Sequence, residues 1–191
     1  MIMGKLRRLN KEIVVAAAAE LANRRSTADL TLTELAAVLN VRVPSLYNHI
    51  AGLDGMRRDL ALFGLRDLLA RLRQAAFGRV GREALLALAH AYRQFAHEQP
   101  GVYPLTLVAP AADDAEWVAL SRELVQMMLL LLASYGLQGD TALHAIRGLR
   151  ALLHGFVSLE AQSGFGLPLD RDESYQRLVT TYLDGLMMRG E

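Results

Sequence analysis

Apolar residues recur every three or four positions along most of the chain, which is the spacing of one face of an α-helix. The first such stretch, Ile13–Leu21, follows Asn10, whose side chain can cap a helix, so we expect a helix over about 10–25. Similar stretches, with Asp113 or Asp114, Asp140 and Asp172 as N-caps, predict helices over about 54–77, 82–99, 114–134, 140–163 and 172–188. The pattern therefore predicts an all-α fold.

Two short helices joined by a tight turn stand out early in the chain. The capping box Thr31-Leu32-Thr33-Glu34 opens a helix that ends at Asn40, a residue that tolerates a left-handed backbone. The next helix, about 43–50, has Leu46 and Ile50 on one face and short polar residues elsewhere. This is a helix-turn-helix pattern, since a helix in the major groove buries one face and offers the other to base edges. A solvated surface helix in an ordinary bundle has the same spacing.

The composition fits a helical domain with a substantial core. Of the 191 residues, 52% are hydrophobic and 21% are charged, which is too apolar for a disordered chain. Only 5 prolines and 6% aromatic residues accompany abundant Leu and Ala, which favours helices. Cysteine is absent, and this excludes disulfides, thiolate zinc sites and a cysteine nucleophile.

Charge is distributed unevenly along the chain. Residues 1–79 hold 13 Lys and Arg against 7 Asp and Glu, a balance of +6. Residues 80–191 hold 8 Lys and Arg against 13 Asp and Glu, a balance of −5. The net charge of +1 is therefore the sum of a basic first part and an acidic second part. A basic first part suggests contact with a polyanion such as DNA, although chance clustering of surface charge gives the same balance.

No segment is apolar for long enough to cross a membrane. The most apolar stretch, Met127–Ala133, is far shorter than the ~20 residues that a bilayer requires. An Ala-rich run follows Lys5 and Arg8 as in a secretion signal, but Glu12 and Glu20 bracket it, so it fits a soluble helix better. We expect a cytoplasmic protein without a membrane partner.

Residues 13–56 resemble the DNA-binding domain of TetR-type transcriptional regulators. The likeness is carried by Ile13–Leu21, Thr31–Ala36, Val41 and above all Ser45-Leu46-Tyr47-Asn48-His49-Ile50. In that family a three-helix head binds DNA, and a larger helical body dimerises and holds an effector. The resemblance implies a head over 1–53 and a body over 54–191. A weaker likeness to a subgroup with a tryptophan/histidine-Gly signature is carried by Pro100–Tyr103, His154-Gly155-Phe156, Asp172–Ser174 and Leu183–Leu186.

The resemblance also implies which residues meet the DNA. The operator-facing set comprises Thr33, Arg42, Val43, Pro44, Ser45, Tyr47, Asn48 and His49. Tyr47 and His49 match positions that contact phosphates in the family. Arg42 replaces a usual capping Ser and Asn40 a usual turn Gly. Leu53 stands where a phosphate-binding Lys is common, and Arg57, a turn further on, can supply that charge.

The family pairs through its last two helices, which implies a homodimer. Gly148 and Gly155, seven residues apart, give one of these helices a low-profile face for close approach. The implied interface comprises Gly148, Leu149, Leu152, Gly155, Phe156, Leu159, Tyr182, Leu183 and Leu186. Stripes of this kind also occur in ordinary cores, so sequence leaves both interpretations open.

Met and aromatic residues of the body suit an adaptable apolar pocket for an unknown small-molecule effector. The candidate lining comprises Tyr92, Phe95, Tyr103, Leu107, Trp117, Met127, Met128 and Phe156. Tyr103 and Trp117 are of particular interest because their polar tips can anchor a ligand. Most of these residues, taken one at a time, fit an ordinary core equally well.

Little in the sequence suggests catalysis. It contains no Gly-rich phosphate loop and no Gly-x-Ser-x-Gly elbow, and we expect no cofactor. His90 and His97 share a helix face, but lone histidines usually make local hydrogen bonds, so we expect no metal site. We therefore expect a ligand-responsive DNA-binding regulator, a repressor released from its operator by a small, largely apolar effector. The alternatives are a helical ligand-binding or scaffolding protein and an all-helical enzyme; steep salt dependence would mark DNA binding.

Overall fold

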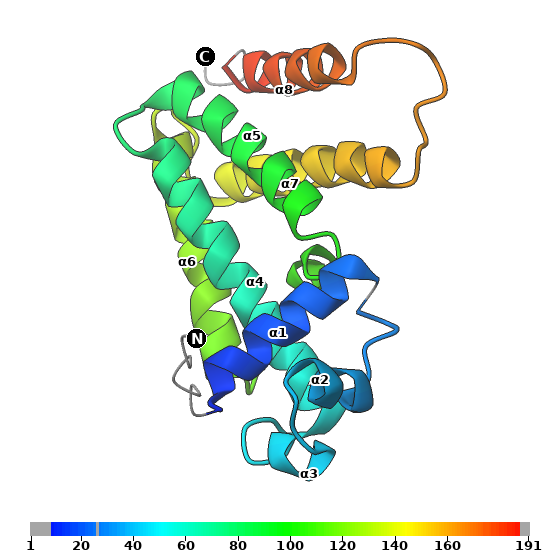
Figure 1. Ribbon diagram of the computed structural model, residues 1–191. Helices are drawn as coiled ribbons and strands as arrows, with labels where there is room; N and C mark the ends of the chain where they lie inside the picture. Colours follow the sequence, from blue (N-terminus) through cyan, green and yellow to red (C-terminus); the bar gives the residue numbers. More distant parts are fainter. Residues whose placement is uncertain (1–8, 26, 188–191) are drawn as a thin grey trace. The chain divides into compact units, whose positions relative to one another are not determined.

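The computed structural model describes residues 9–25 and 27–187, and within them the chain forms only helices and connecting loops (Figure 1). The elements are α1 (Lys11–Arg24), α2 (Leu32–Val38), α3 (Val43–Leu46), α4 (Gly52–Ala76), α5 (Gly81–Glu98), the 3-10 helix η1 (Tyr103–Leu107), α6 (Ala115–Ala133), α7 (Gly139–Ala161) and α8 (Arg171–Met187). The prediction of an all-α fold is confirmed. No helix in these ranges combines the length and apolar character needed to span a bilayer.

The helices form two compact units. Unit 1 contains the described residues up to Leu65 together with Gln99–Ala109, and unit 2 contains Arg66–Glu98 and the described residues from Pro110 onward. Helix α4 contributes residues to both, and the short segment 99–109 joins the first unit although it follows α5. The functional division between residues 53 and 54 stays a prediction.

Unit 1 has a core made by α1, α2, α3 and the first part of α4. Val14, Leu35, Leu46 and Met56 are fully buried in it. Val102, from the segment 99–109, is also buried there. The core explains why helices as short as α2 and α3 are stable, since helices of this length are marginal without tertiary packing.

Asn23, near the end of α1, fastens the segment 99–109 to unit 1. Its Oδ1 accepts hydrogen bonds from the backbone N–H of Gly101 (3.0 Å) and Val102 (3.3 Å), and its Nδ2 donates to Gln99 Oε1 (2.6 Å). A Cβ on Gly101 would overlap the backbone carbonyl of Ala22, so only glycine allows this close approach. The glycine therefore sets how near the segment lies to α1.

Several predicted helix boundaries are confirmed because their signals are local hydrogen bonds. Asn10 Oδ1 accepts from the backbone N–H of Ile13 (2.9 Å), and Thr31 Oγ1 accepts from that of Glu34 (3.2 Å). Asp114 Oδ1 accepts from the backbone N–H of Trp117 (3.2 Å). Asn40 has φ of 52°, which is the left-handed conformation expected after α2.

Three boundary predictions are wrong in detail. The third helix covers only Val43–Leu46, and residues 47–49 form turns instead of further α-helix. The cap of α8 is Asp170, whose Oδ1 accepts from the backbone N–H of Asp172 (2.7 Å), because an N-cap must precede the first helical residue. Helix α7 begins after Gln138, which makes no side-chain cap bond, and Asp140 lies inside its first turn. The predicted end of α8 at residue 188 lies outside the described residues.

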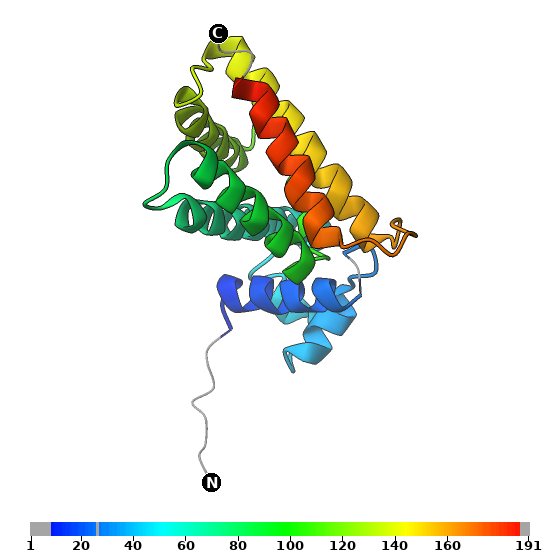
Figure 2. The ribbon, with the colours of Figure 1, turned by 90° about the horizontal axis from the view of Figure 1, so that it is seen from above.

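Unit 2 is organised around α5, α7 and α8. Helices α7 and α8 run antiparallel and side by side (Figures 1 and 2), and α5 packs against both. The Tyr175 ring is fully buried, and its hydroxyl donates to the carbonyl of Ala89 (2.6 Å). Burial raises the pKa of Tyr175, so this hydroxyl stays protonated and keeps donating between α8 and α5.

Candidate nucleic-acid interface

Apolar side chains anchor the helix-turn-helix of unit 1 in the core of that unit. Leu35 and Ala36 of α2, Leu46 of α3 and Ile50 after it are buried in the unit 1 core. The turn between the helices is fixed by a hydrogen bond from the Val41 backbone N–H to the Ala36 carbonyl (2.9 Å). The other side of α3 is thereby left without a role in the core.

The residues predicted to meet DNA are mostly exposed on α2, on α3 and in the turn after it. Thr33, Arg42, Pro44, Tyr47 and Asn48 are exposed, and the Tyr47 side chain keeps 58% of its surface accessible. Val43, Ser45 and His49 are half-buried. A short helix with buried Leu46 and an exposed polar set has the two faces that groove insertion requires.

The two arginines of the predicted contact set differ in their surroundings. Arg42 occupies the N-cap position of α3 but makes no side-chain cap bond, so its guanidinium is not used to hold the helix. Arg57 lies on α4 and pairs with Asp54 at 3.3 Å across one turn. Because this pair is exposed, a phosphate could compete for Arg57 at little cost.

Asp59 is a positioning residue of unit 1 that the sequence analysis missed. Its carboxylate is buried and lies 2.7 Å from Lys11 Nζ of α1 and 3.6 Å from Arg58 Nη1 of α4. It ties α1 to α4 and holds two cations in place. A local signal was absent, because Asp59 and Lys11 are far apart in sequence and Asp on a helix usually faces solvent.

The predicted dimer residues fall into two groups. Leu149, Phe156 and Leu183 are buried in unit 2, and Gly148 lies under the Tyr182 ring, whose hydroxyl donates to the Ala145 carbonyl (2.8 Å). Leu152 and Leu186 are half-buried, while Gly155 and Leu159 are exposed. The buried members therefore belong to the core of unit 2, and only the exposed and half-buried ones have surface that a partner chain could contact.

The predicted effector residues are divided between the units. Tyr103 and Leu107 belong to unit 1, while Tyr92, Phe95, Trp117, Met127, Met128 and Phe156 belong to unit 2. Most are buried, and Leu107, Trp117 and Met127 are half-buried. The Trp117 indole N–H is buried and has no hydrogen-bond partner among the described residues, which is unusual for a buried donor. Within those residues, no group of three or more His, Asp or Glu is placed to hold a metal ion.

Comparison with known proteins agrees with this arrangement. Residues 85–182 match the model of the tetracyclin repressor-like C-terminal domain. The HTH-type transcriptional regulator YobS of Bacillus subtilis strain 168 is 39% identical over 184 residues, which cover 96% of this chain and 95% of the relative. The HTH-type transcriptional regulator Rv0681 of Mycobacterium tuberculosis is 33% identical over 183 residues, which cover 95% of this chain and 84% of the relative.

Solved structures share the fold at lower sequence identity. TetR from Acinetobacter baumannii AYE superposes with a TM-score of 0.71 at 19% identity, covering 95% of this chain and 98% of that one. The regulator SCO7222 from Streptomyces coelicolor superposes with a TM-score of 0.75 at 17% identity, covering 96% and 100%.

Together, the helix-turn-helix of unit 1 and these relatives define a DNA-binding transcriptional regulator. The chain belongs to the TetR family. Regulators of this family are transcription factors without catalytic activity, so the enzyme alternative is not supported. The scaffolding alternative is likewise disfavoured, because curated relatives along nearly the whole chain are transcriptional regulators.

Proposed function

We propose that this protein is a cytoplasmic, homodimeric repressor that leaves its operator when a small, largely apolar effector binds. The observation that carries the DNA-binding part is the exposed polar set around Tyr47 above a helix whose Leu46 is fully buried. In this proposal Tyr47 donates a hydrogen bond to a phosphate, and Pro44, Ser45 and Asn48 face the base edges.

The effector part is supported by Trp117. A buried indole N–H without a partner costs free energy that a ligand with an acceptor atom would recover. Met127 and Met128 lie on the same helix, α6, and their flexible side chains suit ligands of varied shape. A variant of TetR from Acinetobacter baumannii AYE, which shares the fold, is described in complex with minocycline.

The proposed mechanism is a linkage between two conformations. Helix α4 runs from unit 1 into unit 2 without a break, so a shift of its second part in an effector-bound body is transmitted to the DNA-binding head. The effector lowers the affinity for DNA only to the extent that it binds one of the two conformations more tightly than the other. By reciprocity, DNA lowers effector affinity by the same factor.

The dimer part is supported by small and apolar residues that are left exposed on two neighbouring helices. Ala151, Gly155 and Leu159 follow one another at four-residue spacing on α7, and Leu178, Thr181 and Gly185 share a face of α8. We refer to these six residues as the α7/α8 stripe. Small residues let two helix backbones approach closely, which suits a self-complementary interface.

The first experiment is a mobility shift with DNA from the region upstream of the protein's own gene, at several salt concentrations. We expect a specific shift that weakens steeply with salt, as binding through phosphates requires. Tyr47→Ala should weaken binding about tenfold, the loss expected for a hydrogen bond to a charged group. Val38→Ala is the matched control, because Val38 is equally exposed on α2 but lies outside the predicted contact set.

The same preparation tests the effector. The chain has a single tryptophan, so its fluorescence reports directly on Trp117. Compounds that change this fluorescence should also release the DNA. If Tyr47→Ala and Val38→Ala bind alike, and a genome-wide selection returns no enriched sequence, the operator proposal fails.

A further inference from the structure

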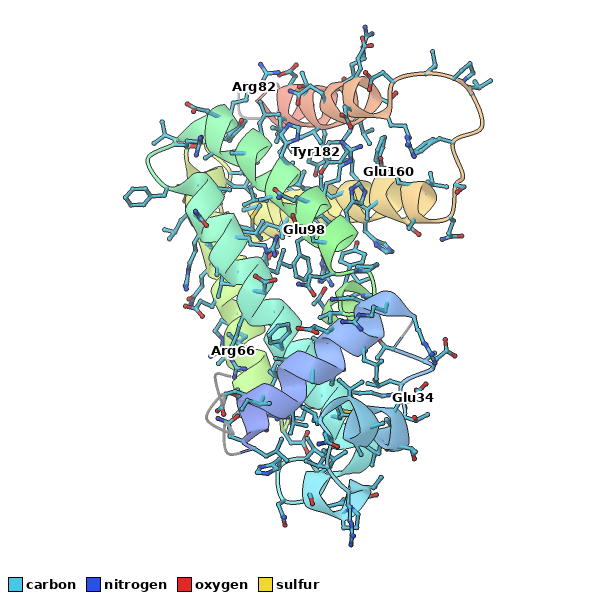
Figure 3. The ribbon with its side chains drawn as sticks, in the orientation of Figure 1. Glu34, Arg66, Arg82, Glu98, Glu160 and Tyr182 are labelled. Atoms are coloured by element: carbon cyan, nitrogen blue, oxygen red, sulfur yellow. The ribbon has the colours of Figure 1, made fainter. Side chains whose placement is uncertain are left out.

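Unit 2 contains a charged cavity that none of the predicted effector residues lines. Its volume is about 640 Å³, which is within the range of small-molecule sites. It lies where the end of α5 meets the end of α7 and the start of α8, and Figure 3 labels Glu98 and Glu160 at the ends of α5 and α7. The lining residues are His90, Arg93, Gln94, His97, Glu98, Glu160, Ala161, Arg171 and Asp172.

Arg93 is held rigidly in this cavity. Its Nε and Nη2 donate to the two oxygens of Glu160 at 2.8 and 2.6 Å, a bidentate pair in which both side chains are largely buried. The guanidinium carbon lies 4.8 Å from the Tyr175 ring centre and 5.5 Å from that of Phe156. The hydrogen bond with Glu160 raises the pKa of Arg93 against the opposing effect of burial. The cation is therefore fixed in place before any ligand arrives.

Arg93 also holds a second carboxylate, and this one is exchangeable. Asp172 Oδ1 lies 2.8 Å from Arg93 Nη2, yet the Asp172 side chain keeps 85% of its surface exposed, against 5% for Glu160. An ion pair with such an exposed partner contributes little free energy. Asp172 thus marks a position at which a carboxylate oxygen reaches Arg93 and from which it can be displaced.

One cation in the lining, Arg171, remains for a ligand. Each carboxylate in the lining already has a cationic partner: Glu98 pairs with Arg71 at 2.5 Å, and Glu160 and Asp172 share Arg93. Arg171, in contrast, makes no ion pair with any residue in the described ranges. With Arg71 included, three arginines face three carboxylates, so the cavity is balanced in charge. When the exposed Asp172 carboxylate turns into solvent, Arg171 is the cation with which a ligand of one negative charge can pair.

We propose that this cavity binds a small organic anion through a carboxylate, which replaces Asp172 on Arg93 and pairs with Arg171. A carboxylate is favoured because its two oxygens match the guanidinium geometry and because a carboxylate already occupies this position. The ligand carboxylate takes the place of the Asp172 carboxylate on Arg93, and the displaced side chain turns into solvent, where its charge is screened. None of the predicted effector residues lines the site, although the ring centre of Phe156, one of that set, lies 5.5 Å from the Arg93 guanidinium carbon.

The test is calorimetric titration of the full chain with benzoate at constant ionic strength, with benzamide as the uncharged analogue and inorganic phosphate as a second anion. We expect saturable benzoate binding, weaker phosphate binding and none of benzamide. Arg171→Gln should weaken benzoate about fivefold, and Asp172→Asn should strengthen it by a similar factor, because the internal competitor is removed.

Arg177→Gln is the matched control, since Arg177 is exposed on the same helix but lies outside the cavity. It should leave benzoate affinity unchanged. Both test positions are exposed, so the variants should fold, and circular dichroism verifies this. Four results would each overturn the proposal: benzoate binding that does not saturate, equally tight binding of benzamide, tighter binding of phosphate than of benzoate, or an Asp172→Asn variant that binds benzoate no better than the parent. None of these outcomes affects the operator experiment.

Discussion

At the scale of single residues, Glu160 is the most consequential charge in unit 2. Burial alone would raise its pKa, but the hydrogen bonds and positive charge of Arg93, with those of His97, outweigh burial and leave the pKa below its ordinary value. The folded state therefore binds this proton less tightly than the unfolded chain does. The resulting stabilisation is complete above the ordinary glutamate pKa of ~4.3 and is lost as the pH falls through the lower, folded-state pKa.

Glu160→Gln should therefore destabilise the protein at neutral pH and lose its effect in acid. Removing one partner of a buried ion pair leaves Arg93 with only the exposed Asp172 carboxylate, and we expect a loss of about 3 kcal/mol at pH 7. Urea unfolding at pH 7 and at acidic pH measures both values. Glu173→Gln, which removes a carboxylate from an exposed pair with Arg177, should change stability by less than about 1 kcal/mol. Equal effects of the two substitutions would show that burial of Glu160 is unimportant.

Gly101 makes a second prediction at this scale. An added Cβ would overlap the Ala22 carbonyl and lie 2.7 Å from the Asn23 backbone nitrogen, so α1 and the segment 99–109 would have to separate. We expect Gly101→Ala to lower the free energy of unfolding by about 2–3 kcal/mol, as overpacking does. Gly166→Ala, at a glycine with open space around it, should stay within about 0.5 kcal/mol of the parent. Denaturant unfolding distinguishes them, and similar values would contradict the close approach.

At the scale of elements, α2 has one threonine that stabilises the helix and another that we expect to contact DNA. Thr31 caps α2 through the Glu34 backbone N–H, while Thr33, two positions later, is exposed and belongs to the predicted contact set. Thr31→Ala should cost about 1 kcal/mol of stability, as loss of an N-cap does. Thr33→Ala should leave stability nearly unchanged and weaken operator binding. Thermal unfolding and mobility shift on both variants test this, and the reverse assignment would refute it.

The elements also show what sequence could and could not predict. The caps at Asn10, Thr31 and Asp114 depend on a hydrogen bond three residues away, so a local pattern was sufficient. The cap at Asp170 was missed because several acidic residues compete there. The charged cavity was missed for a different reason: Arg93 and Glu160 are 67 positions apart, and nothing local indicates that either is buried. Only tertiary packing brings such pairs together.

At the scale of the whole molecule, the proposed function needs two copies of the head. A palindromic operator presents its half-sites about one helical turn, ~34–36 Å, apart, and two recognition helices must match that spacing. The exposed α7/α8 stripe is where we expect the copies to meet. Leu149, Phe156 and Leu183 of the same two helices are buried within one chain and belong to the core of unit 2.

Ala151→Arg should therefore convert the dimer to monomers, because it places a bulky charge within the stripe. Ala119→Arg, the same change at an exposed position of α6 outside the stripe, should leave the dimer intact. Light scattering measures the mass of both variants. The monomeric variant should also lose operator affinity while its melting temperature becomes independent of protein concentration, since dissociation no longer contributes to unfolding. A dimeric Ala151→Arg variant would place the interface elsewhere, because a buried arginine without a partner is too costly to be accommodated in a close helix–helix contact.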